Sequence, residues 1–560
     1  MTELTGLMQD RPLQISAIIQ HGARYSGQRQ IVSRSGDGAL SRYGYRDAEV
    51  RARRLAKGLE RLGVRRSDRI ASLAWNTHRH FEMFYGVPGM GAVLHTLNPR
   101  LWEEQLIYIA NHAEDRVLMF DPDLLDLVTR LSPHLPSVEK YVLLGPREAA
   151  PPNCSLDLIA YEDLLADDDY DWPQFDERTA SILCYTSGTT GMPKGVLSSH
   201  RSVVLHALAA QGATAFGLTA HETVLLVVPM FHAYGWSLPF ISAMVGAKLV
   251  LPGAAPQADV IVDLIHDEGA TLAMGVPTVW TGVFANLDAT GRDLGQLRRA
   301  LIGGSAMPSA MSRRLRDQYG VEPITGWGMT EMSPLGSFSS TTPELDALPE
   351  AERRQRLDTR AGRILFPVEV KTVAASGDST SQDANAGGDI WVRGPTIASG
   401  YYKGEGGAML DAQDWFPTGD VGVIDDDGAI AITDRVKDLI KSGGEWISST
   451  DIERVAVECP GVTQAAAIAA AHPKWQERPL LLVTKAAGAD VDAAAVLATL
   501  RVKLARWQLP DDILFVDELP LTATGKIDKK ILRQNYSNYL IDAAAAADNG
   551  REREGRANER

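Results

Sequence analysis

The sequence has 560 residues, of which 45% are hydrophobic and 23% charged, which is an ordinary globular composition with room for two or more domains. Its net charge of −15 argues against a broad nucleic-acid surface, because phosphate backbones require a basic one, although a small anionic ligand needs only a local basic pocket. The three cysteines form neither a metal spacing nor a disulfide framework, so a reducing cytoplasm fits best.

Helical and strand patterns alternate between residues 15 and 150. We expect helices at Tyr45–Leu62, His80–Gly91 and Glu103–His112, and strands at Arg69–Trp75 and Val117–Phe120. This alternation is typical of a layered α/β domain.

The most informative segment follows a buried strand at Ser181–Cys184. It is Tyr185–Val196, with the sequence YTSGTTGMPKGV. Its glycines let backbone N–H groups approach an anion, and its hydroxyls and Lys194 add further donors. It differs from the common nucleotide loop, in which Gly-Lys-Ser/Thr closes the motif, because Pro193 precedes the lysine. The segment predicts a phosphate-binding loop.

A long stretch between Thr223 and Ala247 contains no Asp, Glu, Lys or Arg and is long enough to span a bilayer. Two prolines, a histidine and a glycine interrupt it. We therefore expect a strand at Val224–Val228, a loop at Pro229–Trp236 and a buried helix from about Leu238. No transmembrane segment is predicted, and peripheral membrane contact stays open.

The α/β pattern continues beyond this stretch. We expect helices at Val203–Ala215, Ile261–Asp267 and Pro308–Tyr319, and strands at Thr271–Met274 and Arg298–Ile302. Two polar stretches, Thr341–Gly362 and Ala374–Gly388, are predicted to be exposed loops. The section that follows them, Asp389–Thr433, is predicted to be β-rich.

The pattern changes after Asp434 to a compact α/β unit. Helices are expected at Asp451–Val457 and Val491–Leu504, and strands near Ala465–Ala469 and Leu480–Thr484. We predict an N-terminal domain over residues 1–434, a hinge at 435–437, a C-terminal domain over 438–541 and a disordered tail over 542–560.

Four further clusters can carry chemistry. In Thr325–Glu331 (TGWGMTE), Trp327 lies between glycines that can open its face to a purine, and Glu331 is a hard oxygen ligand suited to Mg²⁺. A Gly-flanked Trp is, taken alone, more often a packed loop residue. The segment Trp415–Asp420 ends in Asp420, which can either accept both hydroxyls of a ribose or simply form a turn.

The other two clusters lie nearer the C-terminus. Asp434–Trp446 (DRVKDLIKSGGEW) fits either a solvated hairpin or a basic, flexible joint beside a nucleotide. Pro520–Lys529 places Lys526 after a small polar turn, where a lysine is most often exposed to solvent. The significance of this lysine comes from the clusters that precede it.

In this order, the clusters resemble the adenylate-forming superfamily of acyl-CoA synthetases, nonribosomal-peptide adenylation domains and beetle luciferases, over nearly the whole chain. Five motifs look most like those of medium- and long-chain fatty acyl-CoA synthetases and 3-methylthiopropionate–CoA ligases: Leu97–Arg100, Pro229–His232, Leu301–Pro308, Gly326–Glu331 and Trp507–Pro510.

The resemblance implies an α/β fold, in which a large multi-layer N-terminal domain with a β-rich subdomain carries a small mobile α/β C-terminal domain. It implies an ATP-dependent acyl-CoA ligase. Carboxylic acid and ATP give acyl-AMP and pyrophosphate, and coenzyme A then gives acyl-CoA and AMP. ATP and coenzyme A are the implied co-substrates and Mg²⁺ the implied cofactor. A homodimer is an expectation from the relatives.

Site residues follow from the same motif matches. Lys526, Glu331 and Thr186 are implied to be catalytic, and Thr186 and Glu331 to flank the metal. The nucleotide is implied to contact Thr186, Ser187, Gly188, Thr189, Thr190, Gly191, Lys194, Gly304, Ser305, Gly326, Trp327, Gly328, Met329, Thr330, Asp420 and Arg435. Rotation about Lys437 is implied to withdraw Lys526 and to bring in the residues for thioester formation: Lys441, Gly443, Gly444 and Trp446.

The acyl pocket is expected among His232, Trp236, Gly303, Gly304 and Gly326. No acidic residue lies between Glu222 and Asp259, so an α-amino acid would leave its ammonium group unpaired. The expected substrate is therefore an apolar acid of the fatty, methylthioalkanoic or arylalkanoic class. Trp236 is a candidate gate, with Trp446 as its counterpart on the moving domain.

Three other functions stay open at this point. The chain can be a stand-alone adenylating enzyme that loads a separate carrier protein. It can be a binding protein for acyl-AMP or fatty acid, although Lys526 and Glu331 are both present. A luciferase-like oxygenase is a further alternative.

Overall fold

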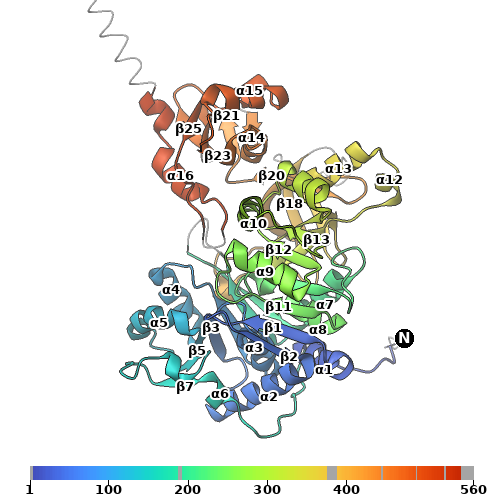
Figure 1. Cartoon of the computed structure of the whole chain (residues 1–560), viewed down its shortest axis with the longest axis vertical. Helices are drawn as coiled ribbons and strands as arrows, with labels where there is room; N and C mark the ends of the chain where they lie inside the picture. The colour runs from blue at the N-terminus through green and yellow to red at the C-terminus, as the bar shows by residue number, and fades with distance from the viewer. Residues whose placement is uncertain are drawn as a thin grey trace, which may run out of the picture.

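The computed structural model describes residues 4, 6–186, 192–374, 387–442, 445–486, 488–522 and 525–543. Within these residues the chain forms four β-sheets (Figure 1). Two large sheets and a small antiparallel one belong to the N-terminal region, and the fourth sheet belongs to residues 440–543, here called the C-terminal unit. The predicted α/β class, with a large and a smaller unit, is confirmed.

The first large sheet lies at the bottom of Figure 1 and has seven strands within the described residues. Its pairs are parallel except for the last, β8–β9. The order is β7 (Leu158–Ala160), β6 (Lys140–Leu143), β5 (Asp115–Phe120), β3 (Arg69–Leu73), β4 (Val93–Leu97), β8 (Ala180–Tyr185) and β9 (Gly195–Ser199). Strand β4 is buried along its whole length, as expected for a parallel strand that is covered on both faces.

The second large sheet has nine strands within the described residues, and its central pairs are parallel. The order is β16 (Arg363–Ile364), β15 (Leu335–Phe338), β14 (Glu322–Gly328), β13 (Arg299–Ile302), β12 (Leu272–Gly275), β10 (Thr223–Leu226), β11 (Lys248–Leu251), β1 (Gln30–Arg34) and β2 (Leu40–Gly44). The carboxyl ends of β10, β12, β13 and β14 therefore meet along one edge.

Helices separate and cover the two large sheets. One buried cluster joins strands of both sheets to the helices between them: α1 (Ile15–Ser26), α2 (Tyr45–Arg61), α3 (His78–Gly89), α7 (His200–Gln211) and α8 (Leu238–Val245). Helices α4 (Glu103–Ala113) and α5 (Leu125–Leu131) cover the outer face of the first sheet, and α9 (Ala258–Glu268) and α10 (Pro277–Thr290) that of the second. The N-terminal region is thus an αβαβα sandwich. Its helices pack through apolar faces, such as the buried face of α2 that carries Ala48, Ala52, Leu55 and Leu59.

One loop prediction is wrong. The stretch Thr341–Gly362 contains helices α12 (Pro343–Asp346) and α13 (Glu350–Thr359). Helix α13 buries none of its residues, so it has no apolar stripe that a sequence pattern could reveal. Pairs of Glu350 with Arg353 and Arg354 stabilise it locally instead.

The predicted helix over Pro308–Tyr319 is also only partly regular. It begins as α11 (Ser309–Arg313) and continues as a wider turn over Arg314–Gln318. Short helix α6 (Tyr161–Leu164) completes the N-terminal region. The prediction for Ala374–Gly388 lies mostly outside the described residues, as does the predicted tail beyond residue 543.

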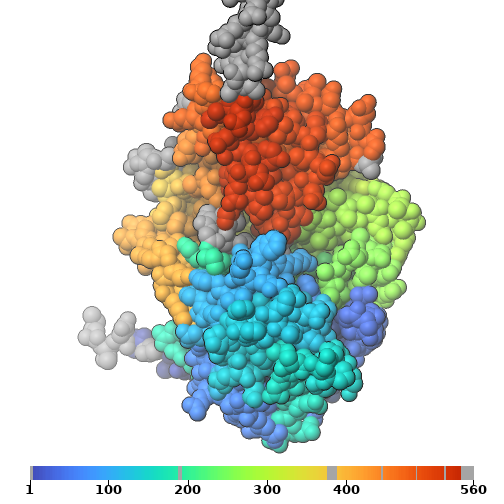
Figure 2. Space-filling model, turned by 90° about the vertical axis from the view of Figure 1, so that its left-hand side faces the viewer, coloured from blue at the N-terminus to red at the C-terminus, as the bar shows by residue number. Residues whose placement is uncertain are grey.

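The β-rich section forms the small antiparallel sheet β17 (Glu369–Val373), β18 (Gly388–Arg393), β19 (Phe416–Ile424) and β20 (Ile430–Arg435). The C-terminal unit follows, with strands β21 (Ile440–Ser442), β22 (Glu445–Ile447), β23 (Val462–His472), β24 (Gln476–Lys485) and β25 (Asp512–Phe515). Helices α14 (Ser449–Ala456) and α15 (Ala493–Lys503) cover one face of its sheet and α16 (Lys529–Tyr536) the other. Figure 2 shows this unit, in orange and red, seated on top of the N-terminal region.

The uncharged stretch Thr223–Ala247 folds as the sequence predicted. It contains strand β10, a turn at Ala233–Ser237 and the eight-residue helix α8. Within the described parts of the chain, no helix is long and apolar enough to cross a membrane.

Candidate active site

Strand ends bring the first group of predicted residues together. Gly303 and Gly304 follow β13, and a Cβ added to Gly304 would lie 3.4 Å from Cε of Lys526 in the C-terminal unit. The same Cβ would lie 3.2 Å from Cγ1 of Val276, which follows β12. Gly304 also has φ +82°, a conformation that side-chain-bearing residues rarely adopt. The Lys526 side chain therefore reaches across to the carboxyl edge of the second large sheet, where ligands of α/β proteins commonly bind.

The Lys526 ammonium is in an unusual electrostatic setting. Removal from water lowers the pKa of Lys526 to about 8, and the positive charges of Arg435 and Lys437 act in the same direction, whereas Asp420 opposes them. A turn closed by hydrogen bonds with Thr522 holds the backbone: Lys526 N donates to Thr522 Oγ1 over 3.1 Å. An anion beside Lys526 would relieve this unfavourable charge.

His232 and Trp236 lie on the turn between β10 and α8. Burial lowers the pKa of His232 to about 4, and the nearby Lys526 charge adds to this effect, so the imidazole is neutral at pH 7. The indole of Trp236 lies over Gly303, where an added Cβ would be 2.9 Å from the ring. A side chain at 303 would therefore have to displace the Trp236 indole.

This turn, Ala233–Ser237, has a left-handed backbone. Gly235 and four residues that carry a Cβ have φ between 37° and 64°. The left-handed conformation costs such residues roughly 1–2 kcal/mol each, so the surroundings must hold the turn.

A second group of predicted residues surrounds Asp420. Asp420 on β19 and Arg435 on β20 are direct cross-strand partners, and Arg435 Nε lies 3.1 Å from Asp420 Oδ1. Trp327, at the end of β14, donates from Nε1 to Asp420 Oδ2 over 2.7 Å. A carboxylate accepts about four hydrogen bonds, so Asp420 is oriented by these contacts and keeps capacity for a ligand. Trp327 itself is a strand residue with only 8% of its surface exposed, not a residue of an open loop.

The third group includes Tyr401, which the sequence reasoning missed. Glu331 is buried in the turn after β14, and its Oε1 accepts a hydrogen bond from the Tyr401 hydroxyl over 2.7 Å. The Lys194 ammonium lies 4.8 Å from the centre of the Tyr401 ring, a cation–π distance. Burial raises the pKa of Glu331, so its carboxylate would gain from a cation beside it. The aromatic pair Tyr401-Tyr402 directly after Gly400 was the available signal.

The phosphate loop is closed at its base by two contacts between Thr186 and Lys194. Thr186 N donates to Lys194 O over 2.9 Å, and Lys194 N donates to Thr186 Oγ1 over 3.3 Å. The other predicted loop ligands, from Ser187 to Gly191, lie outside the described residues.

The remaining nucleotide candidates line the same strand ends. Gly326 and Gly328 belong to β14, and a Cβ on Gly328 would lie 2.0 Å from the Pro334 carbonyl oxygen. Met329 and the buried Thr330 follow that strand. Ser305 is exposed next to Gly304.

The residues predicted for thioester formation are not in this cluster. Lys441 and Trp446 face each other across the β21–β22 hairpin, where the ammonium lies 4.7 Å from the indole ring. Trp446 is 45% exposed, and within the described residues no hydrogen bond or ion pair links either residue to Lys526. Gly443 and Gly444 lie outside the described residues. Lys437, the predicted hinge, lies between β20 and β21, and burial lowers its pKa.

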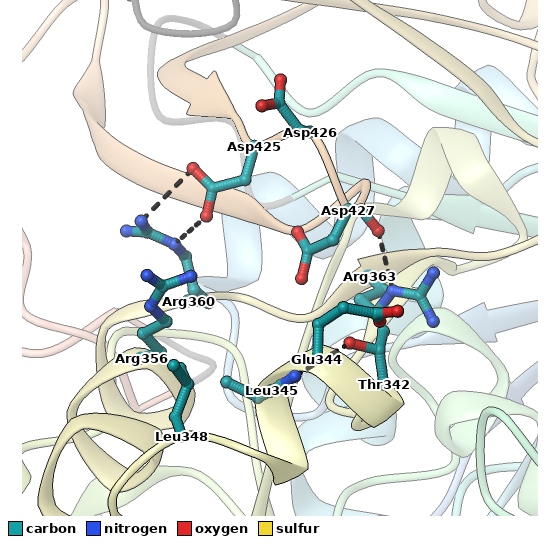
Figure 3. Close-up of a pocket in the computed structure, with 10 residues that line it drawn as sticks. All are labelled: Thr342, Glu344, Leu345, Leu348, Arg356, Arg360, Arg363, Asp425, Asp426 and Asp427. Atoms are coloured by element: carbon teal, nitrogen blue, oxygen red, sulfur yellow. Dashed lines mark hydrogen bonds and ion pairs between the residues drawn. The ribbon is translucent and has the colours of Figure 1, made fainter.

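A separate polar pocket of about 720 Å³ lies between α12, α13 and the β19–β20 turn (Figure 3). Arg360 pairs there with Asp425, and Arg363 donates to the Asp427 carbonyl oxygen. Arg360 and Arg363 are thus engaged by the neighbouring Asp425–Asp427 turn, and Arg356 pairs with Glu352. None of the predicted site residues lines this pocket. It is distinct from the cluster around Lys526.

Comparisons with known proteins identify the family of the chain. The family described as AMP-binding enzyme matches residues 19–402, and the AMP-binding enzyme C-terminal domain matches residues 451–526. The chain is 46% identical to a 3-methylmercaptopropionyl-CoA ligase of Ruegeria pomeroyi, over 96% of this chain and all of that protein. It is 43% identical to a medium-chain-fatty-acid–CoA ligase of Ectopseudomonas oleovorans, over 97% and 100%.

Among solved structures, an anthranilate CoA ligase in complex with anthranoyl-AMP superposes with a TM-score of 0.83 at 25% identity, over 96% of this chain and all of that one. The match extends through both the N-terminal region and the C-terminal unit. The chain belongs to the AMP-binding enzyme family and, within it, to the acyl-CoA synthetase branch of the adenylate-forming enzymes.

Proposed function

We propose that this acyl-CoA ligase activates an apolar carboxylic acid at the Lys526 cluster and that the structure corresponds to the adenylation step. The observation that carries the proposal is the approach of Lys526, from the C-terminal unit, to Gly304 and His232 of the N-terminal region. A desolvated ammonium between the two units suits a reaction that joins two anions, a carboxylate and a triphosphate.

In the first half-reaction a carboxylate oxygen bonds to the α-phosphorus of ATP, and the bond to the bridging oxygen of the β-phosphate breaks, releasing pyrophosphate. Lys526 stabilises the negative charge that gathers between acid and α-phosphate, while Thr330 contacts that phosphate. Lys194, Thr186 and the loop Ser187–Gly191 hold the departing pyrophosphate. Adenosine is placed by Trp327 and by the Gly304–Ser305 edge, and its ribose by Asp420 and Arg435.

The residues present fit Mg²⁺. Glu331 offers a buried carboxylate with one oxygen oriented by Tyr401, and Thr186 offers a hydroxyl. Within the described residues no cluster of three or more His, Cys, Asp or Glu could hold a metal alone, which suits an ion that takes its other ligands from phosphates and water. Bound there, Mg²⁺ would supply charge neutralisation to the phosphates.

In the second half-reaction the thiol sulfur of coenzyme A bonds to the acyl carbon, and AMP leaves with the electron pair of the acyl–oxygen bond. We propose that rotation about Lys437 withdraws Lys526 and brings Lys441, Gly443, Gly444 and Trp446 to the site. The glycines leave room for the pantetheine arm.

The acid itself is proposed to be short. The proposal rests on the Trp236 indole, which packs against Gly303 at the strand end where the acid is expected to bind. His232 is neutral and close to Lys526, which lets it face a carboxylate without adding a second positive charge. The absence of an acidic side chain between Glu222 and Asp259 disfavours an amino acid. We therefore propose a methylthioalkanoic or short fatty acid as the substrate.

A pyrophosphate-release assay over a panel of acids, with and without coenzyme A, tests the proposal. We expect release with 3-methylthiopropionate and short fatty acids, slower release as the chain lengthens, and acyl-CoA only when coenzyme A is added. Faster turnover with long-chain acids would contradict the short-acid assignment. If product formed only with a phosphopantetheinyl protein, the acyl acceptor would be a carrier protein and not coenzyme A.

A further inference from the structure

The left-handed turn Ala233–Ser237 is held from two sides. The Tyr234 hydroxyl bonds to Ser198 Oγ on β9, and Ser237 Oγ lies 2.7 Å from Nδ1 of His206 on α7. Ser237 has no exposed surface, and His206 has only 2%. Both bonds are therefore shielded from water and fix a backbone that would otherwise relax.

His206 uses its second ring nitrogen on a different segment. The backbone N–H of Leu335 donates to His206 Nε2 over 2.9 Å. Because a backbone N–H can only donate, Nε2 is the acceptor, and Nδ1 carries the hydrogen that is donated to Ser237 Oγ. Burial lowers the pKa of His206 to about 3, so the ring keeps this neutral tautomer throughout the physiological range.

Leu335 begins β15, directly after the turn that contains Thr330 and Glu331. One imidazole on α7 thus links the Ala233–Ser237 turn to β15, and its partner Leu335 lies 129 residues away in sequence. One segment carries His232 and Trp236 of the acyl pocket, and the other follows the residues proposed for the α-phosphate and the metal.

We propose that His206 is a positioning residue that holds the acyl-pocket turn in register with the Thr330–Glu331 turn, so that the bound carboxylate and the α-phosphate meet at reacting distance. The inference rests on the proposed function. His206 reaches the reacting groups only through Ser237 and Leu335. Near-attack geometry is sensitive to shifts of about 1 Å, so losing this link affects both substrates together.

The chain offers a matched pair of variants. His206→Leu removes both bonds of the ring, whereas Tyr234→Phe loosens the same turn and leaves the hydrogen bond between Leu335 and His206 in place. His206→Gln keeps an acceptor and a donor on a side chain of similar reach, and Ser237→Ala removes only the turn-side bond. The measurement is initial-rate pyrophosphate release with the KM for acid and the KM for MgATP determined separately, together with the thermal midpoint of each variant.

We expect His206→Leu to raise both KM values or to lower kcat by roughly tenfold, and Tyr234→Phe to raise only the KM for the acid. His206→Gln should recover most of the loss. The pH dependence of kcat/KM should be the same in His206→Gln and in the wild type, since a positioning residue transfers no proton.

Four results would overturn the inference. His206→Leu could lower the thermal midpoint while leaving kcat and both KM values within twofold, which marks a purely structural residue. His206→Leu could raise only the KM for the acid, as is expected for Tyr234→Phe, which would show that His206 does not link the acid site to the MgATP site. His206→Gln could lose a limb of the pH profile, which assigns proton transfer to His206. If Ser237→Ala is used because His206→Leu does not fold, unchanged KM values for both substrates overturn the inference equally. Failure of the wild type to release pyrophosphate with any acid would instead contradict the proposed function.

Discussion

Two lysines of the C-terminal unit occupy opposite situations. Lys526 lies beside Gly304 and His232 of the N-terminal region, with a pKa lowered to about 8. Lys441 lies on the exposed β21–β22 hairpin, paired with the ring of a half-exposed Trp446. The sequence motifs imply that both lysines serve the acyl-CoA ligase reaction, Lys526 in adenylation and Lys441 in thioester formation.

We propose that this arrangement of the two units serves adenylation alone. In that proposal the β21–β22 hairpin reaches the acyl carbon after the C-terminal unit rotates about Lys437, and the same rotation withdraws Lys526. Substitutions at Lys526 are therefore expected to impair adenylation, and substitutions on the β21–β22 hairpin to impair thioester formation.

The largest effect is expected at Lys526. In Lys526→Ala the charge between carboxylate and α-phosphate is no longer neutralised, so acid-dependent pyrophosphate release should fall by roughly 10²–10³-fold. Lys529→Ala is not a suitable control, because Lys529 pairs with the partly buried Glu453. Lys530, exposed at the start of α16, offers a matched one. If Lys526→Ala released pyrophosphate at a rate within tenfold of the wild type, Lys526 would not be the residue that neutralises charge in adenylation.

The hairpin should show the reciprocal defect. Trp446→Ala removes an exposed aromatic surface, which we expect to slow acyl-CoA formation by roughly tenfold while pyrophosphate release in a single turnover stays unchanged. The exposed Trp102, far along the chain on the N-terminal region, serves as the control aromatic. A slower pyrophosphate burst in Trp446→Ala would assign the hairpin to adenylation instead.

A substitution at Tyr401 tests the metal site that is proposed for adenylation. Tyr401→Phe keeps the ring beneath Lys194 but removes the hydrogen bond to Glu331. Because hydrogen bonds to charged groups contribute about 1.5–3 kcal/mol, we expect the Mg²⁺ concentration needed for half-maximal pyrophosphate release to rise by roughly tenfold or more. The neighbouring Tyr402→Phe should leave this requirement unchanged, and equal effects in the two variants would contradict the assignment.

The pH dependence gives the smallest effect. Lys526 must be protonated to neutralise charge, and its pKa in the free enzyme is about 8, so kcat/KM for ATP should hold below this pH and decline as pH rises through it. Lys526→Arg keeps a positive charge at all these pH values, and its profile should lack this alkaline limb. A limb near pH 8 that persists in the arginine variant belongs to another group.

Much of the fold and site followed from the sequence because the motifs sit at strand ends, where glycines and charged residues interrupt apolar runs. Helix α13 could not be found, since ion pairs of Glu350 replace an apolar stripe. Tyr401 and His206 were missed for a related reason. Each acts through a partner far away in the chain, Glu331 for Tyr401 and Leu335 for His206. The local sequence offers at most the aromatic pair Tyr401-Tyr402, and it does not indicate either partner.

The central claim is that Lys526 serves adenylation and not thioester formation. Its most direct test supplies preformed acyl-AMP and coenzyme A to Lys526→Ala and Trp446→Ala and measures acyl-CoA in a single turnover. The account predicts a rate close to that of the wild type for Lys526→Ala and a reduced rate for Trp446→Ala. A loss in Lys526→Ala as severe as its loss in adenylation would contradict it.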